Sequence, residues 1–426
     1  MSRSGPRGGL AGNRDYLRLW GAQGISAFGS HITLVALPLV AILTLEASPF
    51  EVAALTALEL LPFLLLGIPA GVWVDRLRRR PVLVLTDFAR AASLLSIPLA
   101  YGLGALTLPH LYAVALVNGA LTVFFTLAYQ AYLPTLVERA DLVRANARFE
   151  ATETVARLAG PASGGGLVGL LSAPVAILAD AVSFVVSGAL ILRIRDREPP
   201  AERAARPARS RGAFRSELRE GARFALRDDY VRPILATTAV LNVGFGMVWA
   251  VLLVYAVRDL GLGAGVLGLT LSAGEVGGLL GAVAVGRVTT SIGPGPVVVA
   301  APLLFGPAFL AIAIAPSSMP FPSLVIGWAV VSFASVVFNA TTVGVRQSRV
   351  PLRLQGRVVG VSRTIVWGVT PLGALLGGAL GSAVGMRETI VAGAAVALAA
   401  VVPAVLSPLR SLRSLPDAAA PDPARF

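Results

Sequence analysis

Apolar residues occur along this chain in long runs that are separated by short polar gaps. A bilayer core is ~30 Å thick, so a helix needs about 20 mainly apolar residues to cross it. The repeated runs of that length predict an all-α membrane protein with twelve transmembrane helices. The expected spans are Leu19–Leu45, Val52–Val74, Val82–Leu103, Pro109–Val137, Thr152–Leu171, Ala173–Leu192, Pro233–Val257, Gly265–Gly286, Pro296–Ala315, Phe321–Val345, Val358–Val384 and Thr389–Ser407.

Composition agrees with a chain that lies mostly in lipid. Hydrophobic residues make up 55% and charged residues 14% of the 426 residues, whereas soluble domains carry about 25% charged residues. The formal net charge is +13, and the arginines gather at the ends of the apolar runs and in one linker. Membrane topology explains this distribution more simply than nucleic-acid binding does. We therefore expect the lipid bilayer as a partner, and no nucleic acid.

The sequence offers no recognisable metal, cofactor or enzyme motif. It has no cysteine, and its two histidines, His31 and His110, lie far apart, so disulfides and a Cys/His metal site are not expected. The chain has no lysine, which rules out a standard ATP-binding P-loop, and neither H-E-x-x-H nor G-x-S-x-G occurs. We expect neither an enzyme nor an ATP-driven pump.

Arginine placement predicts the topology. Alternate gaps between the expected spans hold only Arg258 and Arg387, while the other gaps and both tails hold nearly all remaining arginines. Because basic residues favour the cytoplasmic side, we expect both termini in the cytoplasm of a multi-pass cell-membrane protein. The expected parts are a tail at 1–18, a six-helix bundle at 19–194, a cytoplasmic linker at 195–231, a second six-helix bundle at 232–408 and a tail at 409–426.

The linker changes character along its length. Residues 199–211 are rich in proline, alanine and arginine and should be flexible. Apolar and charged residues then alternate at helical spacing from Phe214 to Leu226. We expect an amphipathic helix there, either at the inner membrane surface or under the bundle, and the alternative is a solvated linker helix.

A charged turn follows the second apolar run. Gly71 and Asp75 lie four residues apart, and Arg76, Arg79 and Arg80 follow within five residues. The arginines alone are consistent with a stop at the cytoplasmic face. Gly71 would in addition let another helix approach closely. Neither Gly71 nor Asp75 is needed merely to stop translocation.

At this turn the sequence resembles the major facilitator superfamily, whose loop between helices 2 and 3 reads G-x-x-x-D-R-x-G-R-R/K. Arg78 replaces the second glycine of that pattern. The resemblance implies two six-helix bundles with an acid and arginines that latch them together on the cytoplasmic side. We expect Asp87, Arg90 and Arg157 to belong to the same inner gate. We also expect Glu153 to pair with Arg157, one turn further along its helix.

The fifth apolar run contains a second motif, Gly160-Pro161-Ala162-Ser163-Gly164-Gly165. Small residues let helices pack backbone to backbone, and proline bends a helix. In the superfamily a G-P-x-x-G-G pattern on helix 5 is typical of exporters, so the resemblance implies export; the alternative is ordinary tight packing. A looser copy in the second half supports an internal repeat. It comprises Pro371, Gly377 and Gly378.

Four ionisable residues inside apolar runs are candidates for proton or substrate binding, because such groups are costly in a membrane. Glu275 lies ~18 Å from the inner end of its helix and is the first choice for a proton or a cationic substrate. Asp180 is the second choice, although it could simply bond Ser183. Glu59 would lie at the outer mouth, and His31 would serve either as a switch or in packing.

The expected fourth helix has no charge between Leu111 and Tyr132, whereas many drug/proton antiporters carry an arginine there. The chain instead resembles the branch with macrolide-efflux and siderophore-export proteins, on the features Gln130-x-x-x-Pro134, Ala145-Asn146 and Trp367-Gly368. Scattered aromatic residues, Trp249 among them, could line an apolar cavity. We expect Tyr101 and Trp328 at the membrane interface.

These features predict a secondary transporter: a monomeric, proton-coupled exporter of a drug, antibiotic or siderophore-like molecule, lipophilic or amphipathic, that works by alternating access. Two alternatives stay open. One is a proton-coupled importer of a small nutrient on the same fold. The other is a membrane anchor or assembly protein that transports nothing, which the intramembrane acids disfavour.

Overall fold

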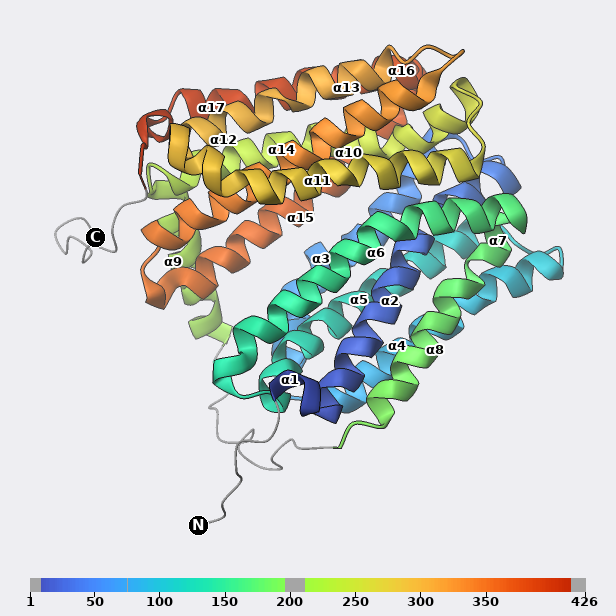
Figure 1. Ribbon diagram of the computed structural model, residues 1–426, viewed down its shortest axis with the longest axis horizontal. Helices are drawn as coiled ribbons and strands as arrows, with labels where there is room; N and C mark the ends of the chain where they lie inside the picture. The colour runs from blue at the N-terminus through green and yellow to red at the C-terminus, as the bar shows by residue number, and fades with distance from the viewer. Residues whose placement is uncertain (1–8, 75, 196–210, 415–426) are drawn as a thin grey trace. The chain divides into compact units, whose positions relative to one another are not determined.

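A computed structural model describes residues 9–74, 76–195 and 211–414, and these form helices joined by short connections (Figure 1). The first half contains α1 (Gly9–Gly12), α2 (Arg14–Leu39), η1 (Val40–Thr44), α3 (Pro49–Val74), α4 (Arg79–Gly102), α5 (Leu108–Leu136), η2 (Arg139–Asp141), α6 (Leu142–Leu170), α7 (Ala173–Ala176) and α8 (Leu178–Leu192). The second half contains α9 (Arg211–Arg227), α10 (Val231–Val254), η3 (Tyr255–Asp259), α11 (Ala264–Ile292), α12 (Pro294–Leu303), α13 (Phe305–Ala313), α14 (Pro320–Arg349), α15 (Leu352–Ala383), α16 (Met386–Ala399), α17 (Val401–Val405) and η4 (Pro408–Ser411).

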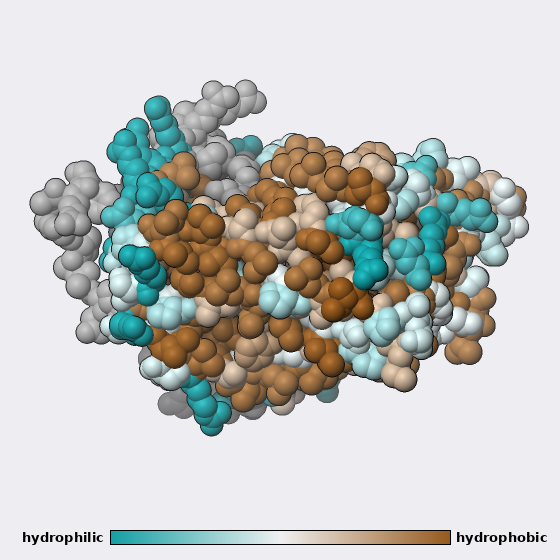
Figure 2. Space-filling model, turned by 90° about the horizontal axis from the view of Figure 1, so that it is seen from above, coloured by the Kyte–Doolittle hydropathy of each residue, from teal (hydrophilic) through white to brown (hydrophobic). Residues whose placement is uncertain are grey.

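Among the described residues, 10 helical segments are long and apolar enough to cross a membrane. The other two expected spans fall on α6 and α15, which are helical throughout. The first half of α6 carries several charges, and among the described side chains of α15 the stretch Gly368–Ala383 is apolar. Figure 2 shows the apolar side chains that cover much of one face, as expected for a surface in contact with lipid. The structure thus supports an all-α membrane fold, and the count of twelve spans stays a prediction.

The chain divides into two compact units. The first unit consists of residues 1–47, 58–207 and 263–272, and the second of residues 48–57, 208–262 and 273–426. The first turns of α3 therefore belong to the second unit and the rest of α3 to the first. The first turns of α11 belong to the first unit and the rest of α11 to the second. Buried side chains such as Tyr16, Leu83 and Tyr132 form the apolar core of the first unit near the start of α2.

The two units repeat the same helix pairing. In the first unit α2 packs against α6 and α8, while α4 packs against α5 and α8. In the second unit α10 packs against α15 and α16, while α13 packs against α14 and α16. Both α2 and α10 also end in a π-helical turn of five residues, η1 and η3. The internal repeat that the sequence suggests is therefore present in the packing.

The amphipathic helix expected at Phe214–Leu226 corresponds to α9. Phe224 and Ala225 are buried against Leu354 and Val358 of α15, within the second unit. Glu220 forms an ion pair with Arg357 of α15 as well. This helix therefore packs against the helices of the second unit and is not a solvated linker.

Candidate functional sites in the two units

Glycines of the helix-5 motif bring α6 into close contact with α2. A Cβ atom at Gly160 would overlap His31, and one at Gly164 would lie 2.9 Å from the carbonyl oxygen of Ile32. Gly165 similarly meets the backbone of Ala264 and Gly268 in the first turns of α11. Only a residue without a side chain allows such an approach.

In the second unit, the region of the looser copy brings α15 into close contact with α10. A Cβ atom at Gly373 or Gly377 of α15 would overlap the backbone of Val243 or Met247 of α10. Gly378 meets the first turns of α3 at Phe50. Tight helix packing, the alternative interpretation of the glycine motif, therefore occurs in both units. Packing by itself does not assign a direction of transport.

His31 of α2 contacts a carboxylate of α6. The distance from His31 Nε2 to Glu153 Oε1 is 2.9 Å, and the side chains are 16% and 38% exposed. Arg157 lies one turn further along α6. We expected Glu153 to pair with Arg157, so the His31–Glu153 contact is a partner that sequence reasoning missed. An imidazole and a carboxylate at this distance can share or exchange a proton.

A second polar cluster of the first unit is fully buried. Asp87 and Arg90 of α4 form a salt bridge of 2.5 Å with exposed fractions of 0% and 4%. Ser187 of α8 donates a hydrogen bond to the other carboxylate oxygen of Asp87, at 2.7 Å. The Arg90 guanidinium lies over the rings of Phe125 and Phe184, at 4.2 and 4.1 Å from their centroids. The cluster holds α4, α5 and α8 together.

Two further carboxyl groups lie near this cluster. Asp180 of α8 is 1% exposed, and one of its carboxylate oxygens accepts a hydrogen bond from Ser183 at 3.0 Å. It is within electrostatic reach of Arg90 and of Glu59 on α3. Asp180 thus interacts with the Asp87–Arg90 salt bridge and also with Glu59. Buried acids so arranged can change their protonation state in response to one another.

The charged turn after α3 contributes to the end of α8. Arg80 donates hydrogen bonds to the carbonyl oxygens of Ile191 and Leu192, which lie at the end of that helix. Cationic side chains stabilise a helix at this end, where carbonyl groups lack partners. Arg76 is exposed, and Arg79 is half-buried at the start of α4.

The expected latch is described only in part, because Asp75 lies outside the described residues. A Cβ atom at Gly71 would meet no described atom within 4 Å, so the close helix approach expected there is not seen in this structure.

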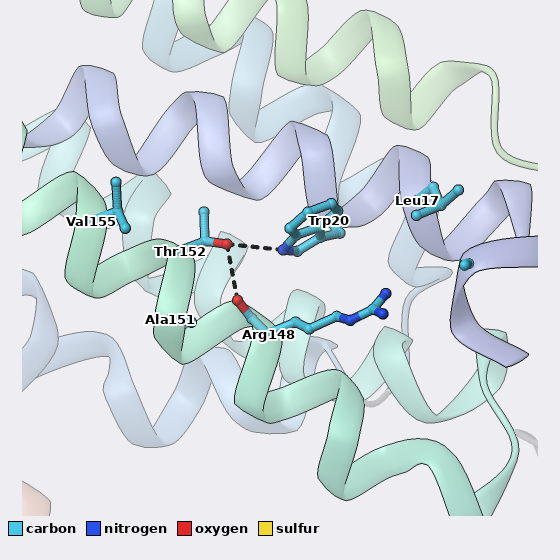
Figure 3. A pocket seen from close by; sticks show the side chains of 7 residues that line it. Leu17, Trp20, Arg148, Ala151, Thr152 and Val155 are labelled. Atoms are coloured by element: carbon cyan, nitrogen blue, oxygen red, sulfur yellow. Dashed lines mark hydrogen bonds between the residues drawn. The ribbon is translucent and has the colours of Figure 1, made fainter.

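An open pocket of about 630 Å³ lies between the first turns of α2 and residues 148–155 of α6 (Figure 3). Trp20 donates a hydrogen bond to Thr152 at 2.9 Å, and the Thr152 hydroxyl donates to the carbonyl oxygen of Arg148 at 2.9 Å. Leu17 and Val155 supply apolar walls. The pocket contains none of the candidate proton or substrate residues.

The second unit holds a different arrangement around Glu275 of α11. Trp328 Nε1 and the Ser332 hydroxyl, both on α14, donate to Oε1 of Glu275 at 3.2 Å each. Gly274 and Gly277 let α14 approach, because Cβ atoms there would overlap Trp328 and Ala329. Both donors are neutral, and within residues 9–74, 76–195 and 211–414 no arginine forms an ion pair with this carboxylate.

Aromatic rings from α10 pack beside this carboxylate. The rings of Trp249 and Trp328 are 5.3 Å apart, and Phe245 lies 6.3 Å from Trp249 and 6.1 Å from Trp328. Trp328 is only 7% exposed. The expectation that Trp328 lies at the membrane interface is therefore wrong, because its indole is buried against Glu275. Its sequence position near the start of an apolar run suggested the interface.

The helices of membrane-crossing length, taken together with the family match, identify a multi-pass membrane transporter and not an enzyme. The chain belongs to the transmembrane secretion effector family of the major facilitator superfamily, whose family model matches residues 12–424. This membership confirms the resemblance on which the expected fold rests.

Similar proteins include efflux pumps. The chain is 30% identical over 379 residues to the multidrug efflux pump Tap of Mycolicibacterium fortuitum, covering 85% of this chain and 88% of that one. It is 28% identical over 383 residues to the multidrug efflux pump Tap of Mycobacterium tuberculosis strain H37Rv, covering 86% and 87%.

Solved transporters share the fold. The crystal structure of the nucleoside transporter NupG has a TM-score of 0.72 at 13% identity, covering 92% of this chain and 98% of that one. A bacterial homologue of the human lysosomal transporter Spinster, in an inward-facing and occupied conformation, has a TM-score of 0.71 at 18% identity, covering 92% and 95%. At such identities the likeness concerns the fold alone.

Proposed function

We propose that this chain is a proton-coupled exporter of small lipophilic or amphipathic molecules such as drugs, antibiotics or siderophores. The observation that carries the proposal is the 30% identity to a multidrug efflux pump across 85% of this chain. Twelve spans, with both termini in the cytoplasm of a cell-membrane monomer, complete the proposed arrangement. Alternating access by two six-helix bundles is the proposed mechanism.

The first unit supplies the proton sites in this proposal. His31 and Glu153 lie in contact across the α2–α6 seam, and that seam is the one closed by the glycines of the helix-5 motif. A change in charge on this pair would alter the attraction between two helices whose backbones touch. Proton binding could thereby be coupled to movement of one helix against the other.

Asp180 and Glu59 are the second pair of proton candidates, since they interact with each other and Asp180 also interacts with the Asp87–Arg90 salt bridge. We assign Asp87 and Arg90 a positioning role, because their bonds to each other, to Ser187 and to two aromatic rings fix the surrounding helices. Arg157, Arg76, Arg79 and Asp75 remain proposed gate residues.

Everted membrane vesicles test the function directly. Vesicles with this chain should accumulate ethidium and a macrolide when the interior is acidified, and should lose both when a protonophore collapses the gradient. Vesicles from cells without the chain are the control. Uptake in the opposite sense, from the outside of right-side-out cells, would identify the importer alternative. Absence of movement for all probes would favour a membrane anchor and contradict the proposal.

A further inference from the structure

Resting on the proposed export function, we propose that Glu275, Trp249 and Phe245 form a binding subsite for lipophilic organic cations, such as quaternary ammonium or phosphonium compounds. All three residues belong to the second unit. The subsite combines the faces of aromatic rings with a carboxylate that none of the described arginines pairs with. Carboxylates and aromatic ring faces both attract large organic cations, which water hydrates only weakly.

The carboxylate is oriented with one oxygen bonded and the other available. Both hydrogen bonds to Glu275, from Trp328 and Ser332, end on Oε1. Among the residues that the structure describes, none donates a hydrogen bond to Oε2. The donors are buried while Glu275 is half-buried, so the donors fix the carboxylate and a ligand could still reach it.

Oε2 of Glu275 lies beside a buried glycine of the same helix. Gly278 lies one turn along α11 from Glu275, and a Cβ atom at Gly278 would lie 3.8 Å from Oε2. That is an ordinary van der Waals contact, so alanine fits there but begins to cover the oxygen. Gly278→Ala therefore partly blocks access to Glu275 and leaves its charge unchanged.

The rings give the subsite its preference for aromatic or alkylated cations. Phe245 and Trp249 are stacked one turn apart on α10 at 6.3 Å, and both are half-buried. The buried Trp328 joins their ring cluster to Glu275 through its indole N–H. Trp328 thus contacts both the ring cluster and the carboxylate, so ring faces and Glu275 would attract the proposed cation together. Inorganic cations gain less there, because they would lose their water shell without enough oxygen ligands.

Equilibrium binding to the full-length chain, purified in detergent, tests the subsite. Tetraphenylphosphonium is the probe, and triphenylphosphine oxide is the neutral comparison. We expect Glu275→Gln to weaken binding of the cation about tenfold or more and to change binding of the neutral compound less than about twofold. Trp249→Ala should weaken cation binding about fivefold, and Trp249→Phe should restore most of it.

Two matched controls lie in the same unit. Glu388→Gln removes an exposed acid at the start of α16, and Phe321→Leu removes an exposed ring at the start of α14; neither should alter binding. Gly278→Ala should fold normally and weaken cation binding about threefold. Equal losses for the cation and the neutral compound in Glu275→Gln, or unchanged cation binding in that variant, would overturn the subsite.

Binding also separates this inference from the proposed function. If the wild-type chain exports nothing from vesicles yet binds the phosphonium ion in the expected pattern, the function fails and the subsite stands. If the chain exports an uncharged lipophilic probe but cation binding does not depend on Glu275, the subsite alone is contradicted.

Discussion

The two units pair their helices in the same way and place different chemistry on them. In the first unit, ionisable groups lie against other ionisable groups, as in His31–Glu153 and Asp87–Arg90. In the second unit, Glu275 is held by neutral donors beside aromatic rings. Charge against charge suits proton exchange and helix fixation, whereas a carboxylate among rings suits recognition of an organic cation. Duplicated packing thus provides two scaffolds that can carry separate tasks.

The largest expected effect concerns the buried salt bridge of the first unit. Arg90→Met leaves the Asp87 carboxylate buried without its cation, and such a loss costs about 3–5 kcal/mol of stability. Thermal unfolding of the purified chain should report it. Replacing both residues, as Asp87→Leu with Arg90→Met, should recover much of the loss because no isolated charge remains.

Arg144→Met is the control for this experiment, since its ion pair with Asp141 is 69% exposed on the arginine side and should contribute no more than about 1 kcal/mol. An Arg90→Met variant as stable as Arg144→Met would mean that the first unit does not depend on its charge pairs.

The next largest effect is expected at the two glycine contacts, α6 with α2 and α15 with α10. Substitutions there test whether the two contacts contribute equally to stability. Valine at Gly164 or at Gly377 would meet the backbone of the neighbouring helix, and overpacking of this kind costs about 1–3 kcal/mol. Both variants should lower the unfolding temperature by similar amounts. Gly166→Ala, at a position with nothing within 4 Å, should be neutral or stabilising. If only one of the two valine variants lowered the unfolding temperature, the two helix contacts would not be equivalent.

The His31–Glu153 contact sharpens the comparison on the functional side. Glu153→Gln and His31→Gln should each lower proton-driven export about tenfold, and the double variant should lose no more than either one, because the pair acts as a unit. Stability should change by less than about 1 kcal/mol, since Glu153 is partly exposed. Glu150→Gln, an exposed acid on the same helix, is the control. Losses that multiply in the double variant would argue for two independent groups.

The smallest effect is expected at Ser332. Ser332→Ala removes one of two donors to Glu275 and should weaken binding of tetraphenylphosphonium about twofold to fivefold, because Trp328 still orients the carboxylate. Ser335→Ala on the same helix is the control. A loss as large as that of Glu275→Gln would show that the serine contributes more than orientation.

Much of the fold could be predicted from the sequence, because lipid imposes a length and a polarity on every helix that crosses it. The amphipathic pattern of α9 identified a helix, and the glycines of α6 and α15 identified positions where backbones touch. The charges on α6 explain why hydropathy does not identify this helix as a span. Hydropathy alone does not distinguish a charged segment that faces other helices from a connection between helices.

Pairings across distant helices could not be predicted in the same way. His31 and Glu153 lie on different helices, and no local spacing relates them. Glu275 was identified by its depth, but its partners Trp328 and Ser332 depend on how α14 packs on α11. The glycines around Glu275 predicted a closely packed helix, but the sequence did not identify that helix as α14.

Export from everted vesicles, measured for ethidium and for an uncharged lipophilic probe in the same preparations, tests the division of tasks most directly. The account predicts that Glu275→Gln loses export of ethidium about tenfold and keeps proton-driven export of the uncharged probe, whereas Glu153→Gln loses both. If Glu275→Gln abolished export of the uncharged probe as well, Glu275 would be part of proton coupling and the division between the units would be wrong.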